Sequence, residues 1–145
     1  MDINRTLNEL LVGLFHDIMT IEEKALRTGE YKDVTANDMH VIEAIGTDRK
    51  KNMSAVAKTL GVTMGTLTIS VNSLVKKGYV ERIRSEEDRR VVLVFLTEKG
   101  KGAYRHHQKF HEDMISAVLE DLSEQEREVL EKSLSKLNAY FKERL

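Results

Sequence analysis

The 145-residue chain contains no cysteine and no proline. The absence of cysteine excludes a disulfide scaffold, a thiol nucleophile and a thiol redox switch. No apolar run approaches the roughly 18 residues that a membrane-spanning helix needs. The N-terminal stretch MDINRTLNEL has neither the basic flank nor the apolar segment of a signal peptide. With 41% hydrophobic and 32% charged residues, the sequence predicts a cytoplasmic globular protein that is either one compact domain or one core with appended helices.

The net charge of −1 conceals a strong asymmetry along the chain. Residues 1–46 carry a net charge of −5, residues 47–105 a net charge of +7 and residues 106–145 a net charge of −3. A basic segment of this kind is typical of a nucleic-acid-binding module. The alternative interpretation is an uneven solvated surface with no bound partner.

The spacing of apolar residues predicts a chain that is mainly helical. Residues 3–26 have a broad apolar stripe at helical spacing, and a short helix follows Thr35 and ends at Gly46. Residues 53–60 form a further helix, and after Gly61 another begins at Thr63 and ends at Gly78. Two short helices joined by a tight glycine turn indicate a helix-turn-helix.

Two β-branched stretches, YVERIR and VVLVFL, then predict a hairpin around SEEDRR. Thr97 begins a long helix, and Ser123 with Glu126 forms the capping box of a last helix. The expected fold is therefore mainly α with a small β-hairpin wing, a winged helix-turn-helix over residues 35–103. The outer helices, residues 1–30 and 104–145, are expected to form a dimerisation domain, because their apolar stripes would be exposed on a monomer.

In a winged helix-turn-helix the second helix lies in the major groove of DNA and the hairpin tip can enter the minor groove. Arg89 and Arg90 stand at that tip, and Asp88 is placed to orient one of the guanidinium groups. The alternative is that the acidic and basic residues of SEEDRR simply pair with one another on a solvated turn.

The stretch DRRVVLVFLT resembles the D-x-R-x-x-x-V-x-L-T wing of the MarR-type transcriptional regulators, and LGVTMGTLTISVNSLVKKGYV resembles their recognition helix and its exit. The resemblance covers nearly the whole chain. It implies a homodimer, joined through its terminal helices, that binds a palindromic operator in double-stranded DNA.

With Leu67, Val71 and Leu74 expected in the core, the other side of the recognition helix would face DNA. Its residues are Met64, Gly65, Thr66, Thr68, Ile69, Asn72 and Ser73. Threonine and isoleucine suit thymine methyl groups, and Asn72 suits adenine, so we expect an A·T-rich operator. Gly65 either allows the backbone to approach DNA closely or fits against a neighbouring helix. The expected phosphate contacts are Lys76, Lys77, Arg82 and Arg84.

Within the family, the chain most resembles the repressors of fatty-acid synthesis in streptococci and their relatives, in stretches such as YKDV, MHVI and KFH. That resemblance implies a long-chain acyl-acyl carrier protein as co-repressor, with its acyl chain in an apolar pocket between the dimerisation helices and the DNA-binding lobe. The candidate lining is Phe15, Ile18, Met19, Met39, Ile42, Phe110 and Met114. Methionine suits a flexible chain, although each of these residues also suits an ordinary core.

Histidines give a second hypothesis about the effector. His107 and His111 are spaced to share one helix face, and His40 with Glu22 or Glu23 is a candidate to complete a zinc site. The alternatives are structural histidines, or histidines that take part in binding the acyl carrier. No cofactor is expected.

Two other classes of protein are less compatible with the sequence. An enzyme is disfavoured because the sequence has no glycine-rich phosphate loop, nucleophile motif or acid–base pair. A helical interaction module would explain the terminal helices, but it would explain neither the basic middle segment nor the wing.

Overall fold

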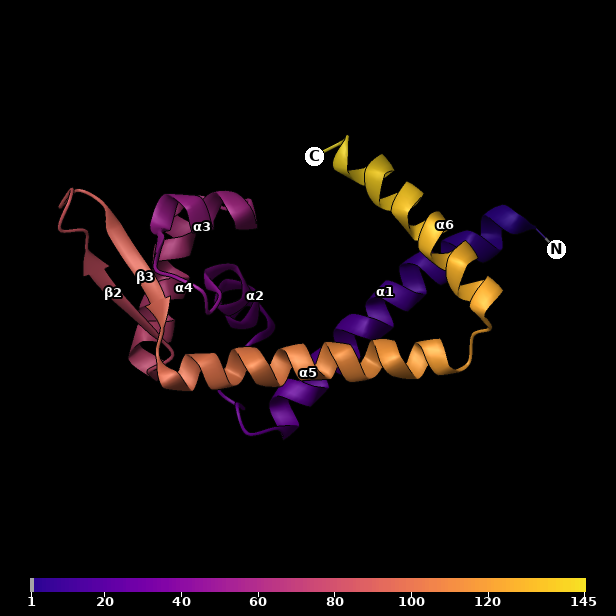
Figure 1. Cartoon of the computed structure of the whole chain (residues 1–145), viewed down its shortest axis with the longest axis horizontal. Coiled ribbons are helices and arrows are strands. Elements are labelled where there is room, and N and C mark those ends of the chain that lie inside the picture. The colour runs from indigo at the N-terminus through magenta and orange to yellow at the C-terminus, as the bar shows by residue number, and fades with distance from the viewer. Residues whose placement is uncertain (1) are drawn as a thin grey trace. The chain divides into compact units, whose positions relative to one another are not determined.

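The computed structural model describes residues 2–145 and is 69% helical. Its elements follow in the order α1 (Ile3–Thr28), α2 (Ala36–Ile45), β1 (Lys51–Asn52), α3 (Met53–Leu60), α4 (Met64–Lys77), β2 (Val80–Arg84), β3 (Val92–Leu96), α5 (Glu98–Glu120) and α6 (Glu124–Lys142). One compact unit of the chain runs as far as Arg105, and His106–Leu145 form the second. Figure 1 shows both units as ribbons.

The first unit is a winged helix-turn-helix, as predicted. Residues 61–63 join α3 to α4, and Gly61 has the left-handed φ of 68° that this tight turn requires. Thr63 caps α4, its hydroxyl accepting a hydrogen bond from the Thr66 amide at 3.1 Å. Gly78 ends α4 with φ of 88°, and the chain turns directly into β2.

The wing is a three-stranded antiparallel sheet in the order β1-β3-β2. Strands β2 and β3 pair from Val80 opposite Leu96 to Arg84 opposite Val92, which confirms the predicted hairpin. The two-residue strand β1, which pairs with β3 directly before α3 begins, was not predicted. Two residues are too short to show an alternating pattern, so the sequence carries no signal for this strand.

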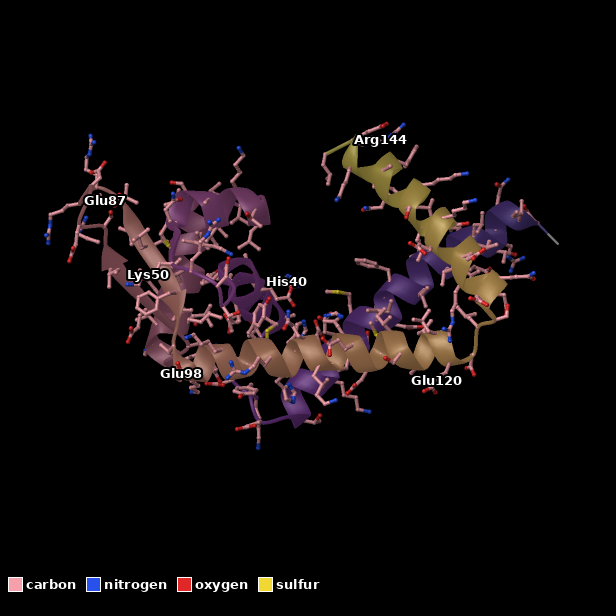
Figure 2. All side chains as sticks on the ribbon, viewed as in Figure 1. His40, Lys50, Glu87, Glu98, Glu120 and Arg144 are labelled. Carbon is pink, nitrogen blue, oxygen red and sulfur yellow. The ribbon has the colours of Figure 1, made fainter. Side chains whose placement is uncertain are left out.

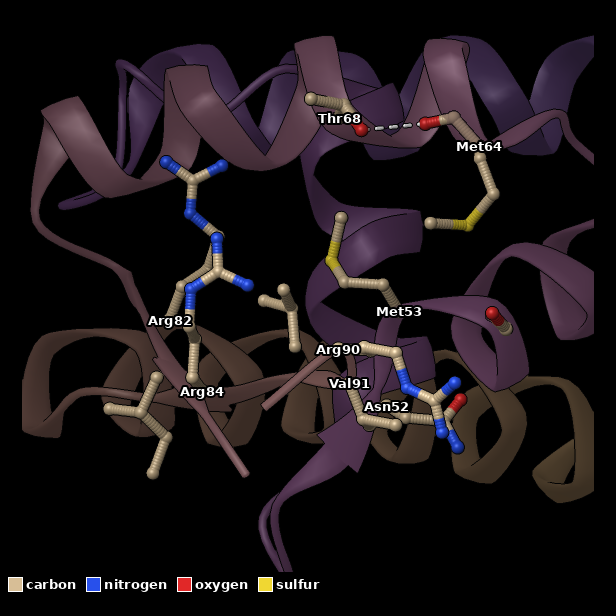
Figure 3. A pocket seen from close by; sticks show the side chains of 11 residues that line it. Asn52, Met53, Met64, Thr68, Arg82, Arg84, Arg90 and Val91 are labelled. Atoms are coloured by element: carbon tan, nitrogen blue, oxygen red, sulfur yellow. Dashed lines mark hydrogen bonds between the residues drawn. The ribbon is translucent and has the colours of Figure 1, made fainter. Parts of the chain in front are cut away.

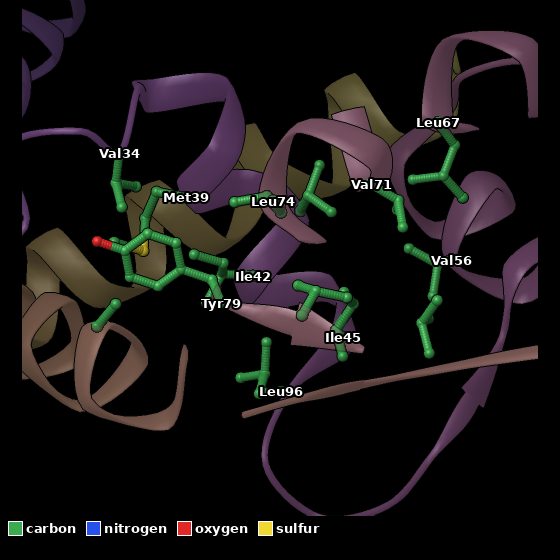
Figure 4. Packing of buried hydrophobic residues seen from close by; sticks show 14 of the residues in the cluster. Val34, Met39, Ile42, Ile45, Val56, Leu67, Val71, Leu74, Tyr79 and Leu96 are labelled. Atoms are coloured by element: carbon green, nitrogen blue, oxygen red, sulfur yellow. The ribbon is translucent and has the colours of Figure 1, made fainter. Parts of the chain in front are cut away.

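An apolar core holds α2, α3 and α4 against the sheet (Figure 4). It includes Ile42, Ile45, Val71, Leu74 and Val94, none of which has any measurable exposure. Full burial of a large apolar side chain contributes roughly 1.5–3 kcal/mol. The core therefore fixes α4, the candidate recognition helix, against the rest of the unit.

A polar cluster ties the end of α4 to the segment between α1 and α2. The Tyr79 hydroxyl donates to the Asp33 carboxylate at 2.5 Å, and the Lys77 ammonium donates to the Asp33 carbonyl at 2.6 Å and to Asp38 at 2.8 Å. Burial, and next this hydrogen bond, raise the pKa of Tyr79, and the same bond lowers the pKa of Asp33. The Lys77 ammonium, which the sequence had suggested as a phosphate contact, is thus bonded to Asp33 and Asp38 within the protein.

The second unit comprises the rest of α5 and the capped helix α6. The Ser123 hydroxyl accepts from the Glu126 amide at 3.2 Å, and the Glu126 carboxylate accepts from the Ser123 amide at 2.9 Å, as the capping box predicted. No residue of α6 is buried. The division into residues 35–103 and a dimerisation domain of residues 1–30 and 104–145 stays a prediction. Within residues 2–145, no helix combines the length and the apolar character needed to cross a membrane.

Candidate nucleic-acid interface

Helix α4 presents one polar face outside the core. Leu67, Val71 and Leu74 are buried, as predicted, so residues between them point away from α2 and α3. Every candidate on the opposite face is exposed or half-buried: Gly65, Thr66, Thr68, Ile69, Asn72, Ser73 and Lys76. Ile69 is the most prominent, because 73% of an apolar side chain is exposed on a polar surface.

The threonines of α4 differ in the hydrogen-bonding groups that remain available. The Thr68 hydroxyl donates to the Met64 carbonyl at 2.7 Å, so its proton is used inside the helix. The Thr66 hydroxyl accepts a hydrogen bond from the Thr63 hydroxyl at 3.0 Å, a bond that does not use the Thr66 proton. A base edge would therefore meet a donor at Thr66 and a methyl group and acceptor at Thr68.

Gly65 has open space around it. A Cβ atom built on this residue would meet only the Thr63 hydroxyl oxygen, at 3.9 Å. Of the two explanations offered for this glycine, the one in which it fits against a neighbouring helix is wrong. Close approach of the α4 backbone to an external partner stays a prediction.

The wing tip holds one arginine in a fixed orientation. The Arg90 side chain donates to both carboxylate oxygens of Asp88, from Nε and Nη2 at 3.0 Å each, and the Arg90 amide donates to Asp88 at 3.1 Å. This pairing lowers the pKa of Asp88 and raises the pKa of Arg90. Arg90 nevertheless remains 91% exposed, so its charge is available to a partner.

The second tip arginine, Arg89, is bonded through its backbone. Arg84 on β2 donates to the Arg89 carbonyl at 2.9 Å, and this bond braces the tip from within. The Arg89 side chain is exposed. Glu87, also exposed, lies at the outer end of the hairpin (Figure 2). Asp88 thus orients Arg90, as the sequence suggested, while Arg89 contributes a solvated charge.

A groove of about 540 Å³ lies between the wing and the first turns of α3 and α4. Its walls carry the methionines Met53 and Met64 and three guanidinium groups, from Arg82, Arg84 and Arg90 (Figure 3). Three cations beside an apolar strip favour the binding of a nucleic-acid backbone, with its phosphates at the cations and its sugars at the strip. Asn52, Ser54 and Val91 also line the groove. The sequence did not indicate them, because they come from separate parts of the chain that only the fold brings together.

Arg82 has a partner that the sequence did not indicate. Its guanidinium donates to the side-chain carbonyl of Asn72, which lies on α4. From the sequence, Arg82 was expected to contact phosphate and Asn72 to contact adenine, as two independent contacts. In the structure, a hydrogen bond joins the two side chains.

The candidate ligand residues fall into two groups. Met39 and Ile42 are 1% and 0% exposed and belong to the core of the first unit. Ile18 and Met19 on α1, and Phe110 and Met114 on α5, are half-buried, whereas Phe15 is 69% exposed. An apolar ligand pocket built from these residues stays a prediction.

Two of the histidines on α5, His107 and His111, form a pair. The Nε2 atoms of His107 and His111 are 2.9 Å apart, and the ring of Phe110 stacks beside His107 with the centroids at 6.2 Å. His40, the third residue of the zinc hypothesis, is an exposed residue of α2 in the first unit. A zinc site that uses His40, His107 and His111 stays a prediction.

Comparison with known proteins identifies the family. A sequence model of the MarR family matches residues 32–91. The transcriptional regulator SarZ of Staphylococcus haemolyticus is 40% identical over 68 residues, which cover 47% of the chain and less than half, 46%, of SarZ. The repressor YetL of Bacillus subtilis is 28% identical over 136 residues, covering 94% of the chain and 74% of YetL.

A solved structure extends the likeness to the whole chain. The structure of Streptococcus pneumoniae FabT in complex with DNA has a TM-score of 0.94 and 40% sequence identity, covering 98% of the chain and 99% of FabT. The MepR–DNA complex of Staphylococcus aureus, at 21% identity and a TM-score of 0.73 over 91% of the chain and 95% of MepR, shares the fold. With this winged helix-turn-helix and these matches, the chain belongs to the MarR family of transcriptional regulators.

Proposed function

We propose that this regulator is a homodimeric repressor that binds an A·T-rich palindromic operator. Helix α4 enters the major groove, with Thr66, Thr68, Ile69, Asn72 and Ser73 at the base edges. The wing reaches the neighbouring minor groove through Arg89 and Arg90, while Lys76, Arg82 and Arg84 contact phosphates. Such a regulator acts on the chromosome and hence in the cytoplasm.

The observation that carries this proposal is the orientation of Arg90. Its guanidinium donates hydrogen bonds of 3.0 Å to both carboxylate oxygens of Asp88, and the side chain is still 91% exposed. An arginine that is ordered before binding loses less side-chain entropy when it enters a narrow groove. The negative potential of an A·T-rich minor groove favours a cation at this position. The likeness to FabT in its complex with DNA supports the same mode of binding.

We further propose that the target genes encode fatty-acid synthesis and that long-chain acyl-acyl carrier protein is the co-repressor. This rests on the sequence resemblance and on the 40% identity with FabT over nearly the full chain. The two recognition helices of a dimer must lie about 34–36 Å apart to meet successive major grooves. A ligand with higher affinity for that spacing strengthens repression by shifting the population of dimers towards it.

DNA binding by the wing is tested with Arg90→Ala. We expect operator affinity, measured by fluorescence anisotropy on an A·T-rich palindrome at fixed salt, to fall roughly tenfold or more. Arg49→Ala is the matched control, because it removes the same charge from an exposed arginine whose nearest carboxylate, on Asp48, is 4.0 Å away. Equal affinities of Arg90→Ala and the parent protein would show that the wing assignment is wrong.

The effector is tested in the same assay by two titrations. Long-chain acyl-acyl carrier protein is expected to tighten operator binding, and Zn²⁺ against a chelator is expected to leave it unchanged. Tightening by Zn²⁺ alone, abolished in His111→Ala, would replace the lipid hypothesis with the metal hypothesis of His40, His107 and His111. DNA binding itself would stand in either case.

A further inference from the structure

Asn72 and Arg82 form a bonded pair on the surface that faces DNA in the proposed function. Asn72 lies in the third turn of α4, and Arg82 lies in the middle of β2. The hydrogen bond that joins them runs from Arg82 Nη1 to Asn72 Oδ1. Both side chains are exposed, so the bond is not needed to satisfy buried polar groups.

The sheet register explains why Arg82 reaches α4. Arg82 is opposite Val94, and Val80 is opposite Leu96. Since alternate residues of a strand share one face, Arg82 lies on the same face of the sheet as these buried residues. At the point where the core ends, this face directs the Arg82 guanidinium towards Asn72 on α4.

The chemistry of the pair determines how the Asn72 amide is turned. A guanidinium is only a donor, so it must be met by the carbonyl oxygen of Asn72 and not by its amide nitrogen. An asparagine without such a partner can rotate its amide by half a turn and offer either group. The bond to Arg82 favours one of these orientations, the one that leaves the NH₂ group as the outward donor.

We infer that Arg82 is a positioning residue that makes Asn72 read the operator as a hydrogen-bond donor. This inference rests on the proposed function, because it concerns how the same interface distinguishes sequences. A donor in the major groove matches the N7 and O6 atoms of guanine, the N7 atom of adenine or the O4 atom of thymine. Cytosine offers only its N4 donor there, so cytosine is the base that Asn72 rejects.

The experiment measures base discrimination rather than affinity alone. Each position of the palindromic half-site is replaced in turn by the four bases, and affinities are measured for the parent, Asn72→Ala, Arg82→Met and the double variant. In the parent, we expect cytosine to be disfavoured about tenfold at one position of each half-site. Asn72→Ala is expected to abolish this preference, and Arg82→Met to reduce it several-fold at the same position.

Two comparisons separate positioning from simple charge. The double variant is expected to lose no more discrimination than Asn72→Ala, because Arg82 acts through Asn72. Arg84→Met removes a neighbouring guanidinium that bonds to the Arg89 carbonyl instead. It is expected to weaken binding and reduce the salt dependence without changing the preference at the position that Asn72 reads. In the free protein, Arg82→Met is also expected to shift the side-chain amide NMR signals of Asn72.

Discrimination that is unchanged in Arg82→Met would overturn the inference and leave Arg82 with the phosphate contact alone. A preference for cytosine at the position that depends on Asn72 would overturn it as well. In both cases the parent still binds the operator, so the proposed function would stand. Failure of the parent to bind any A·T-rich palindrome would overturn the proposed function and the inference together.

Discussion

At the scale of single residues, the interface depends on cations whose directions are set before DNA arrives. Asp88 is the clearest case, because a carboxylate near DNA should oppose binding by repelling phosphate. Its bonds to Arg90 give it the opposite role. Those bonds lower the pKa of Asp88 below its ordinary value of 3.8. The orienting pair is therefore complete at every pH above that value and is lost only as pH falls through the lowered pKa.

Asp88→Ala is therefore expected to weaken operator binding several-fold, even though it removes a negative charge. The neighbouring residue Glu87 supplies the matched control, since Glu87→Ala removes the same charge from the same exposed tip. Glu87→Ala is expected to leave affinity unchanged or slightly tighter. Anisotropy measurements on the two variants at pH 7 give the comparison, and tighter binding by both would mean that Asp88 acts only through its charge.

At the scale of the helix, α4 contains a glycine, a residue that lowers the stability of a helix. Gly65 lies in the first turn, and glycine in a helix costs up to about 1 kcal/mol relative to alanine. A Cβ atom would meet nothing closer than 3.9 Å, so the free protein has room for alanine. Gly65→Ala is therefore expected to raise the free energy of unfolding by up to about 1 kcal/mol.

The same substitution is expected to weaken operator binding, because the added methyl group would lie where the helix backbone meets DNA. Chemical denaturation and anisotropy on one preparation measure both effects. A variant that is more stable and binds equally well would show that α4 does not approach DNA at Gly65. A gain in the free energy of unfolding together with a loss of operator affinity would distinguish a glycine needed for DNA binding from one needed only for the fold.

The elements themselves were largely predictable from local signals. Thr35, Thr63 and Ser123 each cap a helix as their side chains suggested, and Gly61 and Gly78 end helices with left-handed backbone angles. These signals are local because each depends on a hydrogen bond or a steric limit within a few residues.

Contacts between elements could not be predicted in this way. The bond from Arg82 to Asn72 depends on the register of β2 on β3, and the bonds from Lys77 to Asp33 and Asp38 depend on the packing of α4. Sequence spacing contains no information about either. For this reason the candidate DNA contacts were proposed as separate side chains, and Lys77 was assigned to phosphate.

At the scale of the whole molecule, the apolar residues of the terminal helices need a partner. Leu134 and Phe141 on α6 are 52% and 56% exposed, and Leu7, Leu14 and Phe15 on α1 are 48%, 58% and 69% exposed. Exposed stripes of this kind mark association surfaces. In a twofold homodimer the same surface of each copy covers that of the other, which removes both stripes from water.

Leu134→Asp tests this arrangement, because it places a carboxylate within the stripe of α6. We expect the variant to sediment as a monomer and to bind the palindrome at least tenfold more weakly, since two linked half-site contacts become independent ones. Lys132→Asp is the control, because residue 132 is about half a turn from Leu134 on the helix and lies outside the stripe. It should remain dimeric. A Leu134→Asp protein that sediments as a dimer and keeps its operator affinity would exclude the α6 stripe as the dimer interface and leave the wing and α4 as described.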